Sequence, residues 1–400
     1  MSGRAMAPQL LTRAGARRHS HAQHVLRLPV AQVPRAPWEA LGGRSLEPNG
    51  FFDHGFAQAA SRHAWNGRGN DALVAFDGAS QGRMLAFLPV VSAWAALRLP
   101  VPALVARQPY TVLSSPLLDP ERAVEAAGAL IDGAAGAGAH LLVLPFARLQ
   151  GATADAIAEA LARRGIAPAE VDNAHERAAY ASTGDVESYL RGGMGAKRLK
   201  EMRRLRHRLD DEGAVAFTVA DRPDTIAPAV QRFLALEASG WKGKQGTGLA
   251  QAQGDARFVE LAALDMGARG GFEVAELQLD GRTIAAGLVL KGAGQALFFK
   301  IAYDESMGRV SPGVQLTLEM TRRFAENPEI SFVDSTAAAG HPMIDHIWRE
   351  RLAVGDLLIA TRPNDPLAAG ISRLVIGRRR ARERAKSLLL SLRNRKEKRL

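Results

Sequence analysis

Cysteine is absent from the 400 residues of this chain. Its absence excludes disulfide bonds, thiolate metal sites and cysteine nucleophiles together, and it fits a reducing compartment. Long apolar runs are missing too, because stretches such as 83–91 and 141–146 have only the length of strands. A membrane-spanning helix needs roughly 20 apolar residues. We therefore expect a cytoplasmic protein without a membrane span.

Several motifs that would indicate a metal or nucleotide site are also missing. The sequence has no P-loop and no dinucleotide-binding glycine pattern. His341 and His346 lack the His-Glu-x-x-His arrangement, and the histidines at 19, 21 and 24 lie in a basic stretch without a predicted scaffold. We therefore predict no metal. The segment Gly78-Ala79-Ser80-Gln81-Gly82 matches a hydrolase pattern, but it joins two predicted strands, so we interpret it as a hairpin turn.

What remains is the composition of a globular protein with two domains. At ~100–200 residues per domain, 400 residues favour two cores plus tails. The predicted organisation is a flexible basic tail (1–30), an N-terminal domain (31–175), a C-terminal domain (176–365) and a basic helix or tail (366–400). The net charge of +11 is concentrated in that last segment, which also contains leucines. An anionic membrane surface is one partner that it fits, and nucleic acid is another.

Apolar periodicity predicts an α/β (α+β) protein, with a mixed twisted sheet flanked by helices in each half. In the second half, Asp280-Gly281 between two apolar runs indicates a tight hairpin. A third strand is expected at 296–303, a helix from 314 and a further helix at 341–351. Between the last two, 330–334 has the pattern of a buried strand.

Four segments of the second half stand in a distinctive order. They are Leu236-Glu237-Ala238-Ser239-Gly240-Trp241-Lys242-Gly243, Lys300-Ile301-Ala302-Tyr303-Asp304-Glu305, Ser311-Pro312-Gly313, and Phe332-Val333-Asp334 followed by Asp345-His346-Ile347-Trp348. Together they resemble the GNAT superfamily of acyltransferases, in its CelD/Fem-like branch. The resemblance implies tandem GNAT-like domains, the first degenerate, with acetyl-CoA or another acyl-CoA as co-substrate. It also implies a carbohydrate acceptor of the kind used in cellulose or exopolysaccharide biosynthesis.

The helix that follows Ser311-Pro312-Gly313 is the expected position of the coenzyme pyrophosphate. Backbone N–H groups and the positive end of a helix dipole favour phosphate there, and glycine allows a close approach. An ordinary helix N-cap by Ser311 is the alternative. The predicted cofactor contacts are Ile301 on the preceding strand, Gly308, Ser311, Gly313 and Val314.

Three carboxylates are candidates for the base that accepts the acceptor's proton: Glu237, Asp304 and Asp334. Each has a structural alternative, namely an ion pair at a helix end for Glu237, a turn for Asp304 and a cap for Asp334. The predicted acceptor-binding residues are Arg198 in a basic helix, Trp241 and Lys242 in a glycine-rich loop, and Lys300 and Tyr303 on the strand before the pyrophosphate position.

The preferred function is therefore direct acyl transfer from acyl-CoA to a carbohydrate or cell-envelope acceptor, by a cytoplasmic enzyme peripheral to the membrane. A Fem-type transferase that takes its acyl group from aminoacyl-tRNA is the nearest alternative, with the basic surface as the tRNA attachment region. A non-catalytic scaffold of a polysaccharide assembly is the third.

Overall fold

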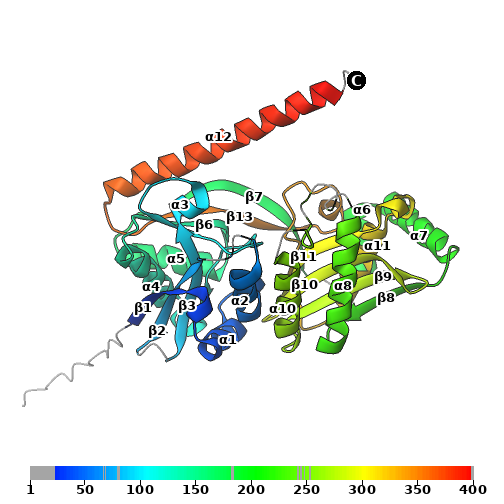
Figure 1. The fold of residues 1–400 in the computed structure, drawn as a ribbon, viewed down its shortest axis with the longest axis horizontal. Coiled ribbons are helices and arrows are strands. Elements are labelled where there is room, and N and C mark those ends of the chain that lie inside the picture. Colours follow the sequence, from blue (N-terminus) through cyan, green and yellow to red (C-terminus); the bar gives the residue numbers. More distant parts are fainter. Residues whose placement is uncertain are drawn as a thin grey trace, which may run out of the picture.

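One long sheet runs through both halves of the molecule (Figure 1). The structure, a computed structural model, describes residues 23–397 except 66, 68, 79–81, 182–183, 241–242, 244–245, 247 and 252–253. Within this part of the chain the sheet has 13 strands. Two neighbouring strand pairs, β4 with β6 and β11 with β12, are parallel, and the others are antiparallel. The predicted mixed sheet flanked by helices is confirmed.

The two halves contain a similar series of elements. The first half contains β1 (Gln23–Pro29), α1 (Arg35–Arg44), α2 (His54–His63), β2 (Asp71–Asp77), β3 (Met84–Ser92), α3 (Ala93–Leu97), β4 (Ala103–Ala106), β5 (Leu117–Leu118), α4 (Ala123–Gly136), β6 (Leu141–Arg148), α5 (Ala152–Arg163) and β7 (Glu170–Ala181). The second contains α6 (Val186–Met194), α7 (Ala196–Asp210), β8 (Val215–Ala220), α8 (Pro223–Ser239), α10 (Asp255–Gly267), β9 (Phe272–Leu279), β10 (Arg282–Gly292), β11 (Gln295–Tyr303), α11 (Pro312–Glu326), β12 (Phe332–Asp334), β13 (Glu350–Ala360) and α12 (Pro366–Glu397).

The halves exchange their last strands. The sheet order is β1-β2-β3-β4-β6-β13-β7-β12-β11-β10-β9-β8. Thus β13, from the end of the second half, pairs with β6 of the first, while β7, from the end of the first half, pairs with β12 of the second. The two exchanged strands also pair with each other, and Figure 1 shows them passing between the halves. Neither half therefore completes its sheet alone.

Helices cover both faces of the C-terminal part of the sheet. Buried residues of α8 and α10 pack with Phe272 and Val274 of β9, whereas those of α7 and α11 pack with Ala275 and Leu277. Since side chains alternate along a strand, these two groups of helices lie on opposite faces. On the α10 face, Phe56 of α2 meets Phe258 edge to face at 5.0 Å, so a helix from each half forms a joint core.

Some expected boundaries differ from the structure. The Asp280-Gly281 hairpin is confirmed, with both residues at positive φ (48° and 76°), as a tight two-residue turn requires. The flexible tail expected over 1–30 is too long, because β1 begins at residue 23 and pairs along its whole length with β2. The boundary at 175/176 falls inside β7.

The helix expected over 341–351 is wrong. This stretch contains only a short 3-10 turn, Ile344–His346, before β13 begins. The His341 Nδ1 atom accepts the amides of Met343 and Ile344 (3.3 and 3.4 Å), and Trp348 is fully buried with its indole N–H on Thr321 Oγ1 (2.9 Å). Side-chain bonding and burial therefore replace the helical ladder.

The C-terminal helix α12 lies against the first half and then extends beyond it (Figure 1). Ala368 and Ile371 are buried against β4, β6 and β13. Farther along, Arg379 forms a bidentate pair with Asp172 of β7, at 2.6 and 2.7 Å. Residues 381–387 are exposed. Within the described part of the chain, no helix combines the length and the apolar character that a membrane crossing requires.

Candidate active site

The strands β11 and β12 separate after a short stretch of pairing. Only Gln295–Leu297 pairs with Phe332–Asp334, and β11 then continues to Tyr303 without β12 beside it. A pocket of about 240 Å³ lies in the gap. It is lined by 298–301 of β11, by 335–337, and by His341, Met343 and Ile344. Separated strands present backbone donors and acceptors with which an extended ligand can pair.

Helix α11 begins next to the end of β11. Its first residue is Pro312, preceded by Ser311 in the left-handed conformation (φ 51°). Gly313 is buried, and a Cβ atom there would lie 3.0 Å from the Tyr303 ring, so glycine lets the helix start contact the strand end. The positive end of the helix dipole is therefore held beside β11.

The other predicted phosphate contacts are less favourably arranged. The Val314 amide donates to the Ser311 carbonyl (3.0 Å), as does the amide of the following residue (3.1 Å). The Ser311 side chain caps no amide of the helix. Gly308 lies in the 3-10 turn Glu305–Val310, and the nearby Arg309 is paired with Glu212 at 2.8 Å. The helix start thus has the expected position, while its donors are partly engaged.

Glu237 belongs to α8, which covers the face of the sheet opposite to α11. It projects from the last turn of α8 with 3% of its surface exposed, and with Ile301 and Tyr303 it lines a small pocket of about 20 Å³. Its Oε2 accepts the Leu249 amide (2.8 Å), and its Oε1 lies 3.8 Å from Lys300 Nζ. The carboxylate is therefore held in place by a backbone amide and lies within ion-pair distance of a lysine.

Lys300 also contacts the first half of the chain. Its Nζ lies 5.4 Å from the ring centroid of Tyr110, which belongs to the loop after β4. The Tyr110 hydroxyl donates to Asp255 Oδ2, and Asp255 is buried at the start of α10. Burial, together with this hydrogen bond, raises the pKa of Tyr110 well above its usual value. The phenol therefore stays protonated beside the lysine.

Asp304 and Asp334 are engaged in structural contacts. Asp304 caps the turn after β11 and pairs with Arg282 (2.8 Å). Hydrogen bonds from Ser306 and the pair with Arg282 lower its pKa. Asp334 is fully buried on β12, paired with the buried Arg177, and it accepts an amide at 2.8 Å. Neither carboxylate lines either pocket beside β11. The predicted alternatives, a turn and a cap, match these contacts.

The predicted acceptor residues do not all meet. Lys300 and Tyr303 lie on β11 beside Glu237, with Tyr303 37% exposed. Arg198 is exposed on α7, on the other face of the sheet from α8. Trp241 and Lys242 lie outside the described residues.

Sequence reasoning missed Tyr110 and Asp255, and it considered His341 only as a metal ligand. Tyr110 is separated from Lys300 by most of the chain, and its positive φ of 64° has no local sequence signal. His341 lines the pocket between β11 and β12. Its position after β12 was the one available clue.

The comparison with protein families decides the class of the second half. Residues 196–341 match the family described as acetyltransferase (GNAT) domain. This part of the chain is a GNAT domain. The matched stretch contains β11, the start of α11 and Glu237, so the candidate site lies within it and the protein is an acyltransferase. The CelD/Fem-like branch is a finer assignment that this match does not address.

Solved structures share the fold over both halves. FemX superposes with a TM-score of 0.54 at 10% identity, covering 84% of this chain and 98% of its own. The C-terminal domain of a protein described as a lysylphosphatidylglycerol synthetase from Agrobacterium fabrum superposes with a TM-score of 0.50 at 14% identity, covering 85% and 94%. No curated protein matches the sequence. At these identities the likeness establishes the fold alone.

Proposed function

We propose that this GNAT protein transfers an acyl group, most simply acetyl, from acyl-CoA to an amine or hydroxyl of a carbohydrate or cell-envelope acceptor. The observation that carries the proposal is the separation of β11 from β12 directly beside the start of α11. This gap can receive an extended pantetheine arm, and the helix dipole favours the phosphates. The residues present therefore fit an acyl-CoA co-substrate, although Val314 is a weaker phosphate contact than the sequence suggested.

Glu237 is the proposed base. The bound donor supplies a thioester, whose carbonyl carbon the acceptor attacks. Glu237 takes the proton from the attacking amine or hydroxyl as the new C–N or C–O bond forms, and the C–S bond breaks to release the coenzyme thiolate, which is protonated from solvent or from Lys300. Backbone amides near Ile301 are the proposed donors to the carbonyl oxygen. Because acceptor and donor bind together, no covalent enzyme intermediate is required.

Aromatic side chains of the first half support a carbohydrate acceptor. Trp65 is 65% exposed and lines, with Gln108 and Tyr110, a pocket of about 480 Å³. An exposed indole can pack against the apolar face of a sugar ring. Tyr110 belongs to this pocket and also contacts Lys300, so an acceptor bound there would approach the transfer site. Cellulose and other exopolysaccharides are the acceptor class that we propose.

A donor of the aminoacyl-tRNA type is the second candidate. Two observations favour it: the Val314 amide is engaged within the helix start, and α7 presents an exposed basic face that includes Arg198. The FemX-like fold is compatible with this alternative. A basic helix attracts a polyanion through phosphate contacts. Transfer that requires charged tRNA, measured with a labelled amino acid, would favour this function over the first.

The proposed location is the cytoplasmic face of an anionic membrane. Helix α12 supports it, because its residues 381–387 are exposed and include Arg382, Arg384 and Lys386. Basic helices are attracted to anionic lipid headgroups. A scaffold function within a polysaccharide assembly would use the same surface without catalysis.

The deciding experiment is calorimetric titration of the purified protein with acetyl-CoA, compared with the variant Gly313→Trp. We expect the native protein to bind and the variant to lose binding, because an indole at 313 would displace Tyr303 and cover the helix start. Gly136→Trp is the matched control, since Gly136 is exposed at the end of α4 and a Cβ atom added there would meet no atom within 4 Å. Equal melting temperatures show that Gly313→Trp is folded.

If the native protein fails to bind acetyl-CoA and longer acyl-CoA donors, the acyl-CoA proposal is wrong. Binding that survives in a folded Gly313→Trp protein would show that the coenzyme lies elsewhere.

A further inference from the structure

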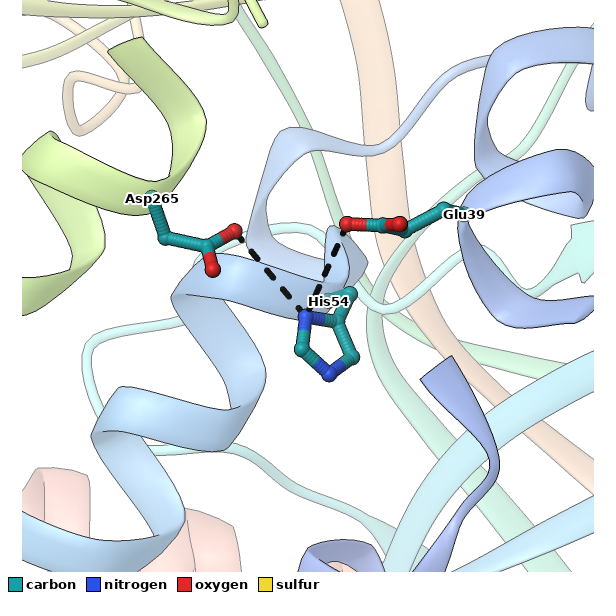
Figure 2. Close-up of side chains that lie close together, drawn as sticks. All are labelled: Glu39, His54 and Asp265. Carbon is teal, nitrogen blue, oxygen red and sulfur yellow. Dashed lines mark ion pairs between the residues drawn. The ribbon is translucent and has the colours of Figure 1, made fainter. Parts of the chain in front are cut away.

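Three side chains converge at the contact between the two halves (Figure 2). Glu39 comes from α1 and His54 from α2 of the first half, and Asp265 comes from α10 of the second. The His54 Nδ1 atom lies 4.0 Å from Glu39 Oε1 and 3.9 Å from Asp265 Oδ1. One ligand atom from each residue lies within 4.8 Å of the other two.

His54 is buried without a hydrogen-bond partner for Nδ1. The residue is 8% exposed, and Nδ1 is among the buried polar atoms that lack a partner. Its distances to the two carboxylates are too long for hydrogen bonds, which require about 2.7–3.2 Å. Two ligands of a tetrahedral zinc ion, each about 2.0–2.2 Å from it, lie roughly 3.4 Å apart. The observed separations exceed this by about half an ångström, so small side-chain movements would bring all three atoms to ligating distance.

Two arginines hold the carboxylates in place. Arg35 donates to Glu39 (3.0 Å) and pairs with Asp265 (3.0 Å), and Arg269 pairs with Asp265 (2.7 Å). Arg269 also pairs with Asp53 at 2.9 Å. Three carboxylates thus face two guanidinium groups, so these paired groups carry one net negative charge. Residues that bond to metal ligands commonly orient them in this way.

The cluster opens into a wide pocket of about 670 Å³, so an ion can reach it from solvent. His54, Asp265 and Arg35 line this pocket, together with Gly55. A Cβ atom at position 55 would lie 2.6 Å from Asp265 Oδ1, so Asp265 approaches His54 only because residue 55 is glycine. An entry path and a cradle that a side chain would fill both favour a bound ion.

We propose that Glu39, His54 and Asp265 bind one divalent first-row transition-metal ion, with zinc as the best match, and that this ion links the two halves. One imidazole nitrogen and two carboxylate oxygens suit such ions, and the remaining positions would be filled by water. Magnesium, which prefers oxygen ligands alone, is expected to bind weakly. The sequence analysis predicted no metal. It could not indicate this site, because the three proposed ligands are far apart in the sequence and form no motif.

Zinc titration of chelator-treated full-length protein tests the proposal. The histidines at 19, 21 and 24 can bind zinc themselves, so the titration uses a background in which all three are alanine. We expect one zinc ion per chain, with at least a tenfold weaker dissociation constant in His54→Ala. His63→Ala is the matched control, since His63 lines the same pocket outside the cluster, and it is expected to bind zinc like the background protein.

Two further measurements separate ligation from a merely structural role of His54. The melting temperature of the background protein should rise with added zinc, and that rise should disappear in His54→Ala and in Asp265→Asn. Cobalt should give a visible absorption band that His54→Ala removes. Absence of zinc binding in the background protein, or equal binding in His54→Ala, would overturn the proposal.

Discussion

The two halves share a strand order but differ in how the fourth strand connects to the next helix. In the C-terminal half, β11 passes through the short stretch 304–311 into α11. In the N-terminal half, β4 is followed by the longer stretch 107–119 and a 3-10 turn before α4 begins. Only the short connection places a helix start against the end of its strand, as Gly313 against Tyr303 shows. The same sheet topology therefore places a helix start at the strand end in one half and a loop in the other.

The longer loop of the N-terminal half serves the site of the other half. Tyr110 in this loop contacts Lys300 on β11, and Arg177 donates to the carbonyl of Val112 (2.7 Å). Thus the first half lacks the compact strand–helix connection but contributes a side chain to the candidate site of the second half. The longer loop therefore accounts both for the missing strand–helix connection of the first half and for the contact of Tyr110 with Lys300.

The largest expected effect follows from changing Glu237 in the C-terminal half. If Glu237 is the base, Glu237→Gln should lower kcat by about 10²–10⁴-fold, because an amide cannot accept the proton, while acetyl-CoA binding is retained. The measurement is steady-state kinetics with an identified acceptor. Glu305→Gln is the control, since Glu305 lines the same small pocket. If Glu237→Gln keeps the full rate, Glu237 is not the base, and another group, such as His341, accepts the proton.

Much of the local structure could be predicted from sequence, and the long-range pairing could not. The Asp280-Gly281 turn and the Ser311-Pro312-Gly313 helix start follow from backbone preferences of single residues, which act locally. The exchange of β7 and β13 has no such signal, because an apolar pattern shows that a strand is buried without showing which strand it pairs with.

The same limit applies to the candidate site. Glu237, Lys300 and Gly313 belong to one half and were found through motifs. Tyr110 meets them only because the halves pack together, and the contacts of Asp304 and Asp334 with arginines depend on side chains placed by the fold. Sequence reasoning therefore named a strand and a helix start that the structure places side by side, while the contacts that distinguish the three carboxylates appear only in the packed structure.

The next largest effect concerns the exchanged strands. Arg177→Met should lower the free energy of unfolding by about 3–5 kcal/mol, because it leaves the buried Asp334 without its partner. Denaturant unfolding measures this change. The double variant Arg177→Met with Asp334→Leu should recover part of the loss, since both charges are then removed. Arg148→Met in the first half is the comparison, with a smaller loss because Glu47 lies 3.5 Å away and is partly exposed. Equal losses at both sites would mean that the buried Arg177–Asp334 pair contributes no more to stability than the Arg148–Glu47 pair.

The smallest effect concerns α12, which packs on the first half and has no counterpart among the described residues of the second. Arg379 holds it to β7 through Asp172, and the hydrogen bond from Arg379 lowers the pKa of that carboxyl. Because the folded-state pKa lies below the unfolded value of about 3.9, the pair stabilises the docked helix above that pH. Its contribution is lost as the pH falls through the folded-state pKa. Arg379→Ala should remove about 1 kcal/mol at neutral pH.

Hydrogen exchange along 366–397 measures this docking directly. Arg379→Ala should exchange faster than the native protein at neutral pH, and the two should converge in acid as Asp172 becomes protonated. Arg380→Ala is the matched control, because Arg380 is 62% exposed and lies 4.0 Å from Asp172.

Since Arg382 of α12 also lines the pocket of the first half, undocking should open that pocket while leaving acetyl-CoA binding unchanged. Loss of coenzyme binding in Arg379→Ala would show instead that the two halves do not divide donor and acceptor between them.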